Sequence, residues 1–462
     1  MSQLIYSIED KPPLRQAVPL GFQQYLTMFG STVAIPFILA DALGASPAQV
    51  AQLIGTIFFV SGIATLLQTT FGNRLPVVQG GTFSFLAPTI AICGMAGMAE
   101  GGFEVKMQHV QGAIIAGALV EMVIGFSGAV GKLLRLVSPV VIAPTITLIG
   151  LALFQFGATK IGAGAHWPIG LLTIGLIVAF SQYLRTRHRI FAMYPVLLGI
   201  LGAWGLCMLL TVTKVFPEGH PAYTDFSKVA AAPVFQVPMP FQWGMPQFTA
   251  AAVVGMLAGY LASVIESVGD YFACARLSGA PVPTEKTVNR GIGFEGIGCF
   301  IAGIFGSGNG TTTYSENIGA IGLTRVGSRR VVQCGAGIMI LLAIFGKFGA
   351  LFSTIPQPIV GGMYCVMFGM IASVGLSNLQ FVDLNSTRNL FVIGFSLFMG
   401  LSVPEYFKGL DGPLVEGTWK WAGDIATSIG SSGMSVGAVI GLILDNTIPG
   451  TDEERGITAW KK

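Results

Sequence analysis

The chain has 462 residues, of which 52% are hydrophobic and only 10% are charged, and its mean hydropathy is +0.71. A soluble protein of this size needs far more surface charge, so the composition excludes that class and predicts an all-α protein that crosses a membrane many times. The formal net charge of +3 is too small to suggest a nucleic acid partner. The 63 glycines and 24 prolines fit closely packed and interrupted membrane helices.

The N-terminal stretch, residues 1–16, carries acids and lacks the short apolar core of a cleaved signal sequence, so we expect the first span to direct insertion. A membrane-spanning helix needs about 20 apolar residues, and fewer where the helix is broken. On that basis we expect fourteen segments, of which the third and the tenth are short and rich in glycine and threonine. Their approximate ranges are 17–40, 50–71, 75–96, 109–130, 137–156, 166–184, 190–213, 247–273, 291–306, 311–325, 331–350, 354–376, 389–403 and 434–448.

The longest loop, residues 214–246, joins the seventh segment to the eighth and separates a first half (1–213) from a second half (247–462). With both termini in the cytoplasm, every arginine lies on the cytoplasmic side, as the positive-inside rule requires. The lysines on the opposite side are Lys106, Lys160, Lys214, Lys228, Lys347, Lys408 and Lys420. We therefore expect a multi-pass protein of the plasma or inner membrane, embedded in the lipid bilayer, with both termini cytoplasmic.

Seven segments in each half give the two halves opposite orientations, as in an inverted repeat. The third segment of each half, at 75–92 and within 309–330, shows small polar residues and then aromatic residues before helical character returns. Matching interrupted segments in inverted halves are the best sequence indication of a transporter's binding site at the membrane midplane. Unpaired backbone groups and half-helix N-termini there suit a small, planar, polar substrate.

Three acids stand out in the expected membrane segments. Glu266 and Asp270 of the eighth segment are spaced i, i+4, so both carboxylates lie on one helical face. Intramembrane acids mark functional sites by default, and Glu316 at the expected half-helix start follows the same logic. Asn317 could cap that half-helix or touch substrate, and the sequence favours neither. For Glu121, a lone acid in the fourth segment, we favour a structural hydrogen bond or helix packing.

The sequence shows no motif for a metal site, a cofactor or a phosphate-binding loop. The six cysteines form no CxxC pair and the four histidines have no ligand spacing, so we expect no metal and no cofactor. The glycine-rich stretch 306–310 lacks the GK[ST] ending of a phosphate-binding loop, which argues against ATP-driven pumping. Phe83 and Phe85 alternate with Ser84; packing is the favoured role, although an extended backbone would point both rings to one side, where one could stack on a ligand.

The run ENIGAIGLTR (Glu316 to Arg325) resembles the signature of the nucleobase–ascorbate transporter family, also called nucleobase:cation symporter-2. That signature begins with Gln, Glu or Pro, continues with Asn-x-Gly and four residues, and ends with Thr and usually a basic residue. The resemblance extends over nearly the whole chain, through GFQQYLTMFGSTVAIPF, QGGTFSFLAP and ESVGDYFACARLSGAP. It implies a 7+7 inverted repeat with a core domain (segments 1–4 and 8–11) and a gate domain (segments 5–7 and 12–14), in a homodimer.

At the site, the chain is similar to the bacterial uracil:proton symporter. The residues that this resemblance places at the substrate are Glu266, Glu316, Phe83, Ser31, Ser84, Tyr314 and Ser315. The two glutamates would hydrogen-bond a base, the phenylalanine would pack on its ring, and backbone groups of both interrupted segments would complete the contacts to its edge.

Two positions depart from the family pattern. The Gln-His pair of the first span reads Gln23-Gln24 here, and Asp270 stands where the uracil symporter has histidine. The coupling cation is therefore H+ or Na+, with H+ favoured because three neighbouring acids could titrate jointly. We assign cation coupling to Asp270, Glu266, Gln23 and Asn317.

Several segments resemble the animal vitamin-C branch and plant nucleobase members of the family. The ascorbate transporters carry Pro where this chain has Glu316, and a glutamate would repel the ascorbate anion, whereas a neutral base with N–H donors suits a carboxylate. We expect a symporter, and not an enzyme, that imports uracil or a purine such as xanthine, guanine or adenine by alternating access. Na+-coupled ascorbate symport is the alternative; anion exchange, a channel and a membrane enzyme have weaker support.

Overall fold

The computed structural model describes residues 4–95, 98, 100–130, 136–162, 166–410, 414–415 and 417–460. Four of the basic residues that were assigned to the cytoplasmic side lie outside this part of the chain: Lys132, Arg135, Lys461 and Lys462. Long apolar runs form the principal helices, because a helix satisfies its own backbone hydrogen bonds in lipid. These are α1 (Leu14–Leu43), α2 (Pro47–Thr70), α4 (Phe103–Phe126), α6 (Pro139–Leu151), α10 (Pro195–Val212), α12 (Ala250–Ser278), α13 (Glu285–Phe305), α15 (Arg329–Ile344), α17 (Gln357–Ser377), α18 (Thr387–Lys408) and α20 (Gly433–Thr447).

Within the described residues, eight helices are long and apolar enough to cross a membrane, or nine if the pair bent by 98° at Ala422–Gly430 and Gly433–Thr447 is one span. The chain is therefore a predominantly helical, polytopic membrane protein. The remaining helices are shorter: α3 (Leu86–Gly94), α7 (Ala158–Gly162), α8 (Trp167–Val178), α9 (Arg189–Met193), α11 (Ser227–Ala231), α14 (Ser315–Thr324), α16 (Gly346–Phe352), α19 (Lys420–Gly430) and α21 (Ile457–Trp460). The count of fourteen spans in a 7+7 repeat stays a prediction.

The two stretches expected to be interrupted meet in the middle of the bundle. Strand β1 (Gln79–Gly81) pairs antiparallel with β2 (Thr311–Thr313), so their backbone groups satisfy each other deep inside the protein. β1 leads through a 3-10 turn (Phe83–Phe85) into α3, and β2 leads directly into α14. A Cβ atom on Gly80 would lie 2.6 Å from the Tyr314 ring, which explains why glycine stands at this crossing.

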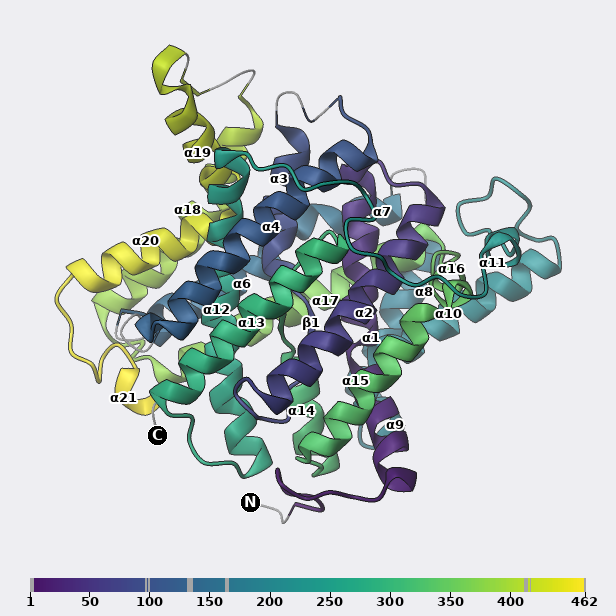
Figure 1. Ribbon diagram of the computed structural model, residues 1–462, viewed down its shortest axis with the longest axis horizontal. Coiled ribbons are helices and arrows are strands. Elements are labelled where there is room, and N and C mark those ends of the chain that lie inside the picture. Colours follow the sequence, from purple (N-terminus) through teal and green to yellow (C-terminus); the bar gives the residue numbers. More distant parts are fainter. Residues whose placement is uncertain are drawn as a thin grey trace.

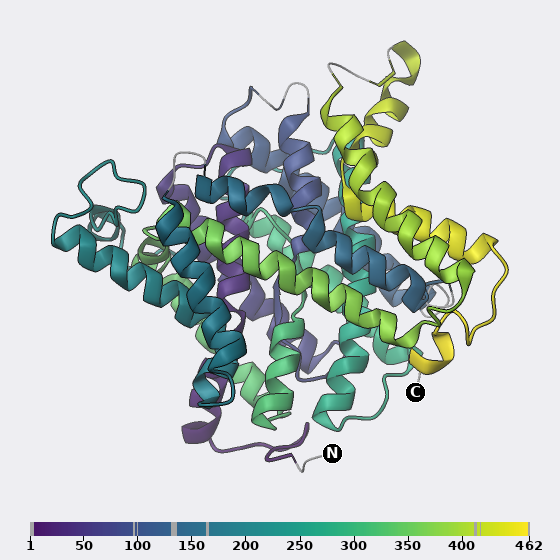
Figure 2. The same ribbon diagram turned by 180° about the vertical axis from the view of Figure 1, so that it is seen from behind.

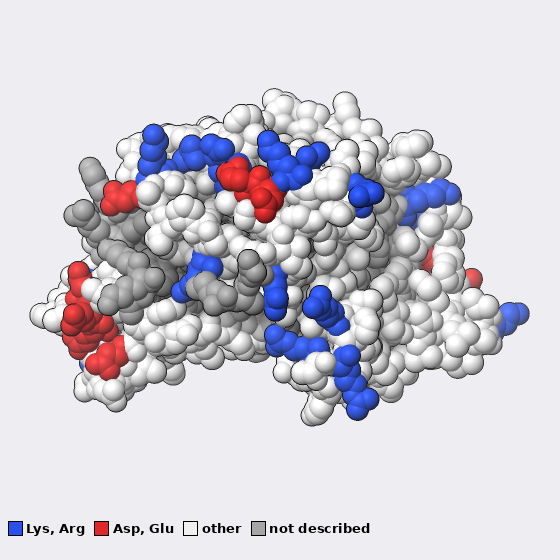
Figure 3. All heavy atoms as spheres, turned by 90° about the horizontal axis from the view of Figure 1, so that it is seen from below, with Lys and Arg blue, Asp and Glu red and all other residues white. Residues whose placement is uncertain are grey.

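Two groups of helices surround this crossing. α13 packs against α4, α15 against α2 and α1, and α12 against α3 and α14, whereas α6, α8, α17, α18 and α20 pack on one another. In both Figure 1 and Figure 2 the yellow helices α18 to α20 and the teal helix α10 stand at opposite edges of the molecule. Both ends of the chain lie at the lower end of Figure 1, and the face seen from that end carries many lysines and arginines (Figure 3).

Candidate functional site

The structure brings together the acids of α12 and the start of α14. Ser315 Oγ donates a 2.7 Å hydrogen bond to Asp270 Oδ1, and Ser31 Oγ of α1 donates a 2.8 Å hydrogen bond to Glu316 Oε1. Asp270 is buried, and its Oδ2 atom has no hydrogen-bond partner in the described part of the chain. Glu266, one helical turn before Asp270, and Glu316 are half-buried. Two elements, α12 and α14, therefore bring three carboxylates close together, and α1 supplies a hydroxyl that holds one of them.

A cavity of about 30 Å³ lies at this point. Glu266, Glu316 and Phe83 line it, together with the strand residues Thr312 and Thr313. Its opposite wall is apolar and comes from the other helix group: Ile146 and Ile149 of α6, Ile371 and Val374 of α17. Since one water needs about 10–15 Å³ of such space, the cavity has room for only a few waters. A larger planar ligand requires α6 and α17 to move away from α12.

Of the two alternating aromatic residues, only Phe83 reaches the cavity. Its ring is half-buried and meets Phe368 edge-on, with 6.1 Å between ring centroids. Phe85 is fully buried and packs on Tyr260 at 4.5 Å. The expected extended backbone would have pointed both rings to one side, but residues 83–85 form a 3-10 turn, which sends the two rings to different sides.

Ser84 and Tyr314 have different roles at the two broken segments. The Ser84 hydroxyl is buried beside Glu266 and has no hydrogen-bond partner among the described residues. Tyr314 OH donates to the Gly81 carbonyl at 2.8 Å and accepts from Thr32 Oγ1 at 3.1 Å, so this ring ties both broken segments to α1.

The predicted coupling residues Gln23 and Asn317 do not hydrogen-bond to the carboxylates. Asn317 Nδ2 donates to the backbone oxygen and to Oε1 of Gln24, at 2.7 and 2.8 Å, and does not cap α14. Gln23 Nε2 lies 3.1 Å from Met193 Sδ of α9. The α1 residue that holds Asn317 is therefore Gln24, which the sequence marked only as a departure from the family pattern.

A further acid beside the site, Glu295 of α13, is buried and was not identified from the sequence. Its Oε1 accepts hydrogen bonds from Ser267 (2.7 Å), Thr312 (3.1 Å) and Ser263 (3.3 Å), and its Oε2 accepts one from Tyr271 (3.1 Å). The signal was present, because Glu295 is an acid in the apolar run GFEGIGCF, and intramembrane acids are functional by default.

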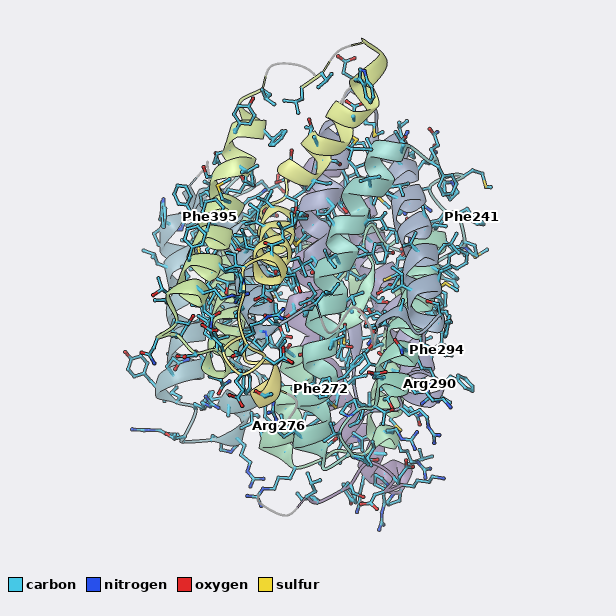
Figure 4. The ribbon with its side chains drawn as sticks, turned by 90° about the vertical axis from the view of Figure 1, so that its left-hand side faces the viewer. Phe241, Phe272, Arg276, Arg290, Phe294 and Phe395 are labelled. Carbon is cyan, nitrogen blue, oxygen red and sulfur yellow. The ribbon has the colours of Figure 1, made fainter. Side chains whose placement is uncertain are left out.

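No lysine or arginine in the described residues forms an ion pair with these four carboxylates, and no basic residue is among the buried side chains there. The arginines of α12 and α13, Arg276 and Arg290, lie in the lower part of the molecule (Figure 4). The described residues also contain no cluster of three or more side chains able to hold a metal ion. Hydroxyls alone stabilise the acids, so the site suits a neutral ligand with N–H donors or a small cation.

A bundle of membrane helices whose two paired, interrupted segments end beside an acid-lined cavity is typical of a membrane transporter. The Xan_ur_permease family, described as a permease family, matches residues 15–409. The chain belongs to this family of nucleobase–ascorbate transporters.

Relatives match over the full chain. Solute carrier family 23 member 2 of Mus musculus is 49% identical and covers 100% of this chain and 77% of its own length. Nucleobase-ascorbate transporter 2 of Arabidopsis thaliana is 40% identical, and the match covers 99% of this chain and 91% of that protein. Among solved structures, the transmembrane domain of the cyanobacterial bicarbonate transporter BicA superposes with a TM-score of 0.56 at 15% identity, over 86% of this chain and 97% of that one. This last likeness concerns the fold alone.

Proposed function

We propose that the protein is a secondary active symporter that imports a nucleobase, uracil or a purine, together with H+. The observation that carries the proposal is that Glu266 and Glu316 line one cavity with Phe83 and, in the described part of the chain, form no ion pair with a lysine or arginine. Two carboxylates accept the N–H groups of a neutral base, and an aromatic ring offers a face for stacking. Ascorbate is an anion, and in a low dielectric two carboxylates without counter-ions repel it.

Asp270 is the favoured coupling group. It lies one turn from Glu266, its Oδ1 is held by Ser315, and its Oδ2 is free to take up a cation. Protonation or Na+ binding there removes a negative charge next to the substrate acids, so cation and base bind more tightly together than alone. In this proposal Asn317 acts through the packing of α1 on α14, and Gln23 acts through the contact of α1 with α9.

Transport then requires movement between two groups of segments. In this proposal the fourteen segments form a core domain (segments 1–4 and 8–11) and a gate domain (segments 5–7 and 12–14) of an inverted repeat, assembled as a homodimer in the cell membrane with both termini in the cytoplasm. The cavity supports this division, since its polar wall comes from β1, β2, α12 and α14 and its apolar wall from α6 and α17. Separation of the two walls opens the site to one side of the membrane at a time.

The test is uptake of labelled uracil, xanthine, guanine and adenine into cells that lack their own carriers, with unlabelled ascorbate as competitor. We expect at least one base to accumulate, and ascorbate not to compete. Accumulation of ascorbate alone would establish the rival function, which the names of the plant relatives include. Removal of Na+ and collapse of the proton gradient, in separate arms, identify the coupling cation.

A further inference from the structure

The segment that joins α11 to α12, residues 232–249, is apolar on its outer side. Figure 1 shows it as a thin teal line that runs across the front of the molecule to the start of α12. No charged residue occurs from 229 to 265. Large apolar side chains that are 38% to 70% exposed follow one another along the segment: Val234, Phe235, Val237, Met239, Phe241, Met245 and Phe248. An exposed apolar surface of this extent marks an interaction site.

The inner side of the same segment is polar and is bonded to the ends of four helices. Gln242 Nε2 donates to the Phe305 carbonyl at the end of α13 (2.7 Å), and its Oε1 accepts from Gln52 of α2 (2.7 Å). Trp243 is buried, and its Nε1 donates to the Gly306 carbonyl at 2.8 Å. Backbone hydrogen bonds join the segment to α15 and α4: Gln236 N to the Ile344 carbonyl and Gln247 N to the Gln108 carbonyl. The segment is therefore fixed to the helix bundle, with its apolar side chains turned outward.

The surroundings of the segment are apolar as well. Phe235 packs on the ring of Phe345, which follows α15, with 5.2 Å between ring centroids. Phe345 is 43% exposed, and Leu341, one turn earlier, is 61% exposed. Four positions of the segment have no N–H group that would need water, because they are prolines: Pro233, Pro238, Pro240 and Pro246. The outer side of the segment thus continues the exposed apolar surface of α15.

The segment lies about one bilayer thickness from the basic end of α13. That helix has 21 residues. At 1.5 Å per residue its length is about 31 Å, close to the thickness of about 30 Å of the hydrocarbon core. Lys286 and Arg290 lie near its first residue, whereas its last carbonyls are those that the segment holds. Phe241 lies on the same edge of the molecule as Arg290 and Phe294, above both (Figure 4). The segment therefore lies where the opposite boundary of the bilayer falls.

We propose that residues 233–248 form an interfacial anchor, whose apolar side inserts between the headgroups and acyl chains of the leaflet opposite the basic face of Figure 3. The partner is the lipid surface itself. Aromatic and aliphatic side chains suit that boundary, and the absence of charge means that anionic lipid is not required. Since its inner side is bonded to α2, α4, α13 and α15, the anchor fixes the ends of these helices to the membrane surface. The inference does not depend on which ligand is transported.

Photochemical cross-linking of the full chain in phosphatidylcholine vesicles tests the anchor. The photoreactive residue p-benzoylphenylalanine replaces Phe235 or Phe248, one at a time, and mass spectrometry detects lipid adducts after illumination. Both side chains are aromatic and more than 60% exposed, so the replacement should leave the fold intact. Phe226 is the matched control, because it is an exposed phenylalanine of the same loop that lies next to Asp225 and near Lys228. We expect at least about tenfold more phospholipid adduct at positions 235 and 248 than at 226.

The outcomes distinguish lipid from other neighbours. Adducts with a second copy of the chain at positions 235 and 248 would overturn the proposal in favour of an interface between copies. Equal lipid adducts at all three positions, or none at 235 and 248, would overturn it as well. Thermal denaturation at the wild-type temperature shows that each variant is folded, and the two positions give independent readings. None of these outcomes bears on the proposed function, which the uptake of labelled base tests separately.

Discussion

Two buried acidic regions of this molecule have opposite surroundings. Asp445 of α20 is 2% exposed and is held by Arg455 Nη2 at 2.7 Å, Arg388 Nη2 at 2.9 Å and Ser138 Oγ at 2.8 Å. The acids around the cavity, by contrast, have hydroxyl partners or none. An acid paired with two arginines fastens helices together, here α6, α18 and α20. Acids without a counter-ion are free to bind a proton, a cation or a base, which is what a coupled transporter requires.

The largest effect is expected from a substitution that removes the acid of the ion-paired region. Asp445→Asn leaves Arg388 and Arg455, whose side chains are 8% and 12% exposed, without their carboxylate. We therefore expect a loss of about 3–5 kcal/mol in the free energy of unfolding, measured by thermal denaturation in detergent. The protein that remains folded should keep the wild-type KM. The matched control is Asp452→Asn, because Asp452 is exposed and lies 3.9 Å from Arg455, and its loss should cost about 0–1 kcal/mol. Equal stability losses in the two variants would contradict the comparison.

The second prediction removes one acid of the cavity. Glu266→Gln replaces an acceptor for the N–H edge of a base, so base uptake should fall at least about 100-fold, equivalent to about 2.7 kcal/mol. The protein should remain in the membrane with unchanged thermal stability, because no arginine or lysine of the described residues forms an ion pair with Glu266. Normal uptake by this variant would take Glu266 out of the site.

A smaller effect is expected from the aromatic wall. Phe83→Ala removes the ring that lines the cavity and should raise the KM for a purine about 10-fold, equivalent to about 1.4 kcal/mol. Phe83→Tyr should retain most of the affinity because it keeps the ring. A loss of protein from the membrane in place of a higher KM would show that Phe83, like Phe85, serves packing.

The smallest effect concerns the hydroxyl that holds Glu316. Ser31→Ala deletes one hydrogen bond to a carboxylate and should weaken base binding about 3- to 10-fold, because Glu316 is less well oriented. Thr145→Val is a suitable control, since that buried hydroxyl bonds only to a carbonyl of its own helix. Equal effects of the two changes on KM would argue against orientation of Glu316 by Ser31.

Local patterns predicted much of the site. The i, i+4 spacing placed Glu266 and Asp270 on one face, and the polar, glycine-rich stretches predicted two extended pieces followed by short helices. Contacts between distant elements were not accessible to such patterns. The pairing of Asn317 with Gln24 depends on how α1 packs on α14, and the divergence of Phe83 and Phe85 depends on a single 3-10 turn. Glu295 could have been found, because the rule that singled out Glu266 applies to it equally.

The most direct test of the central claim is the proton flux that accompanies a base. Purified protein in liposomes with an internal pH indicator receives uracil or xanthine from outside, in the absence of Na+. If the acids without counter-ions couple base to proton, the lumen should acidify in step with uptake of the base, and ascorbate should produce no signal. Uptake of ascorbate that depends on Na+, with no pH change on addition of any base, would contradict the account.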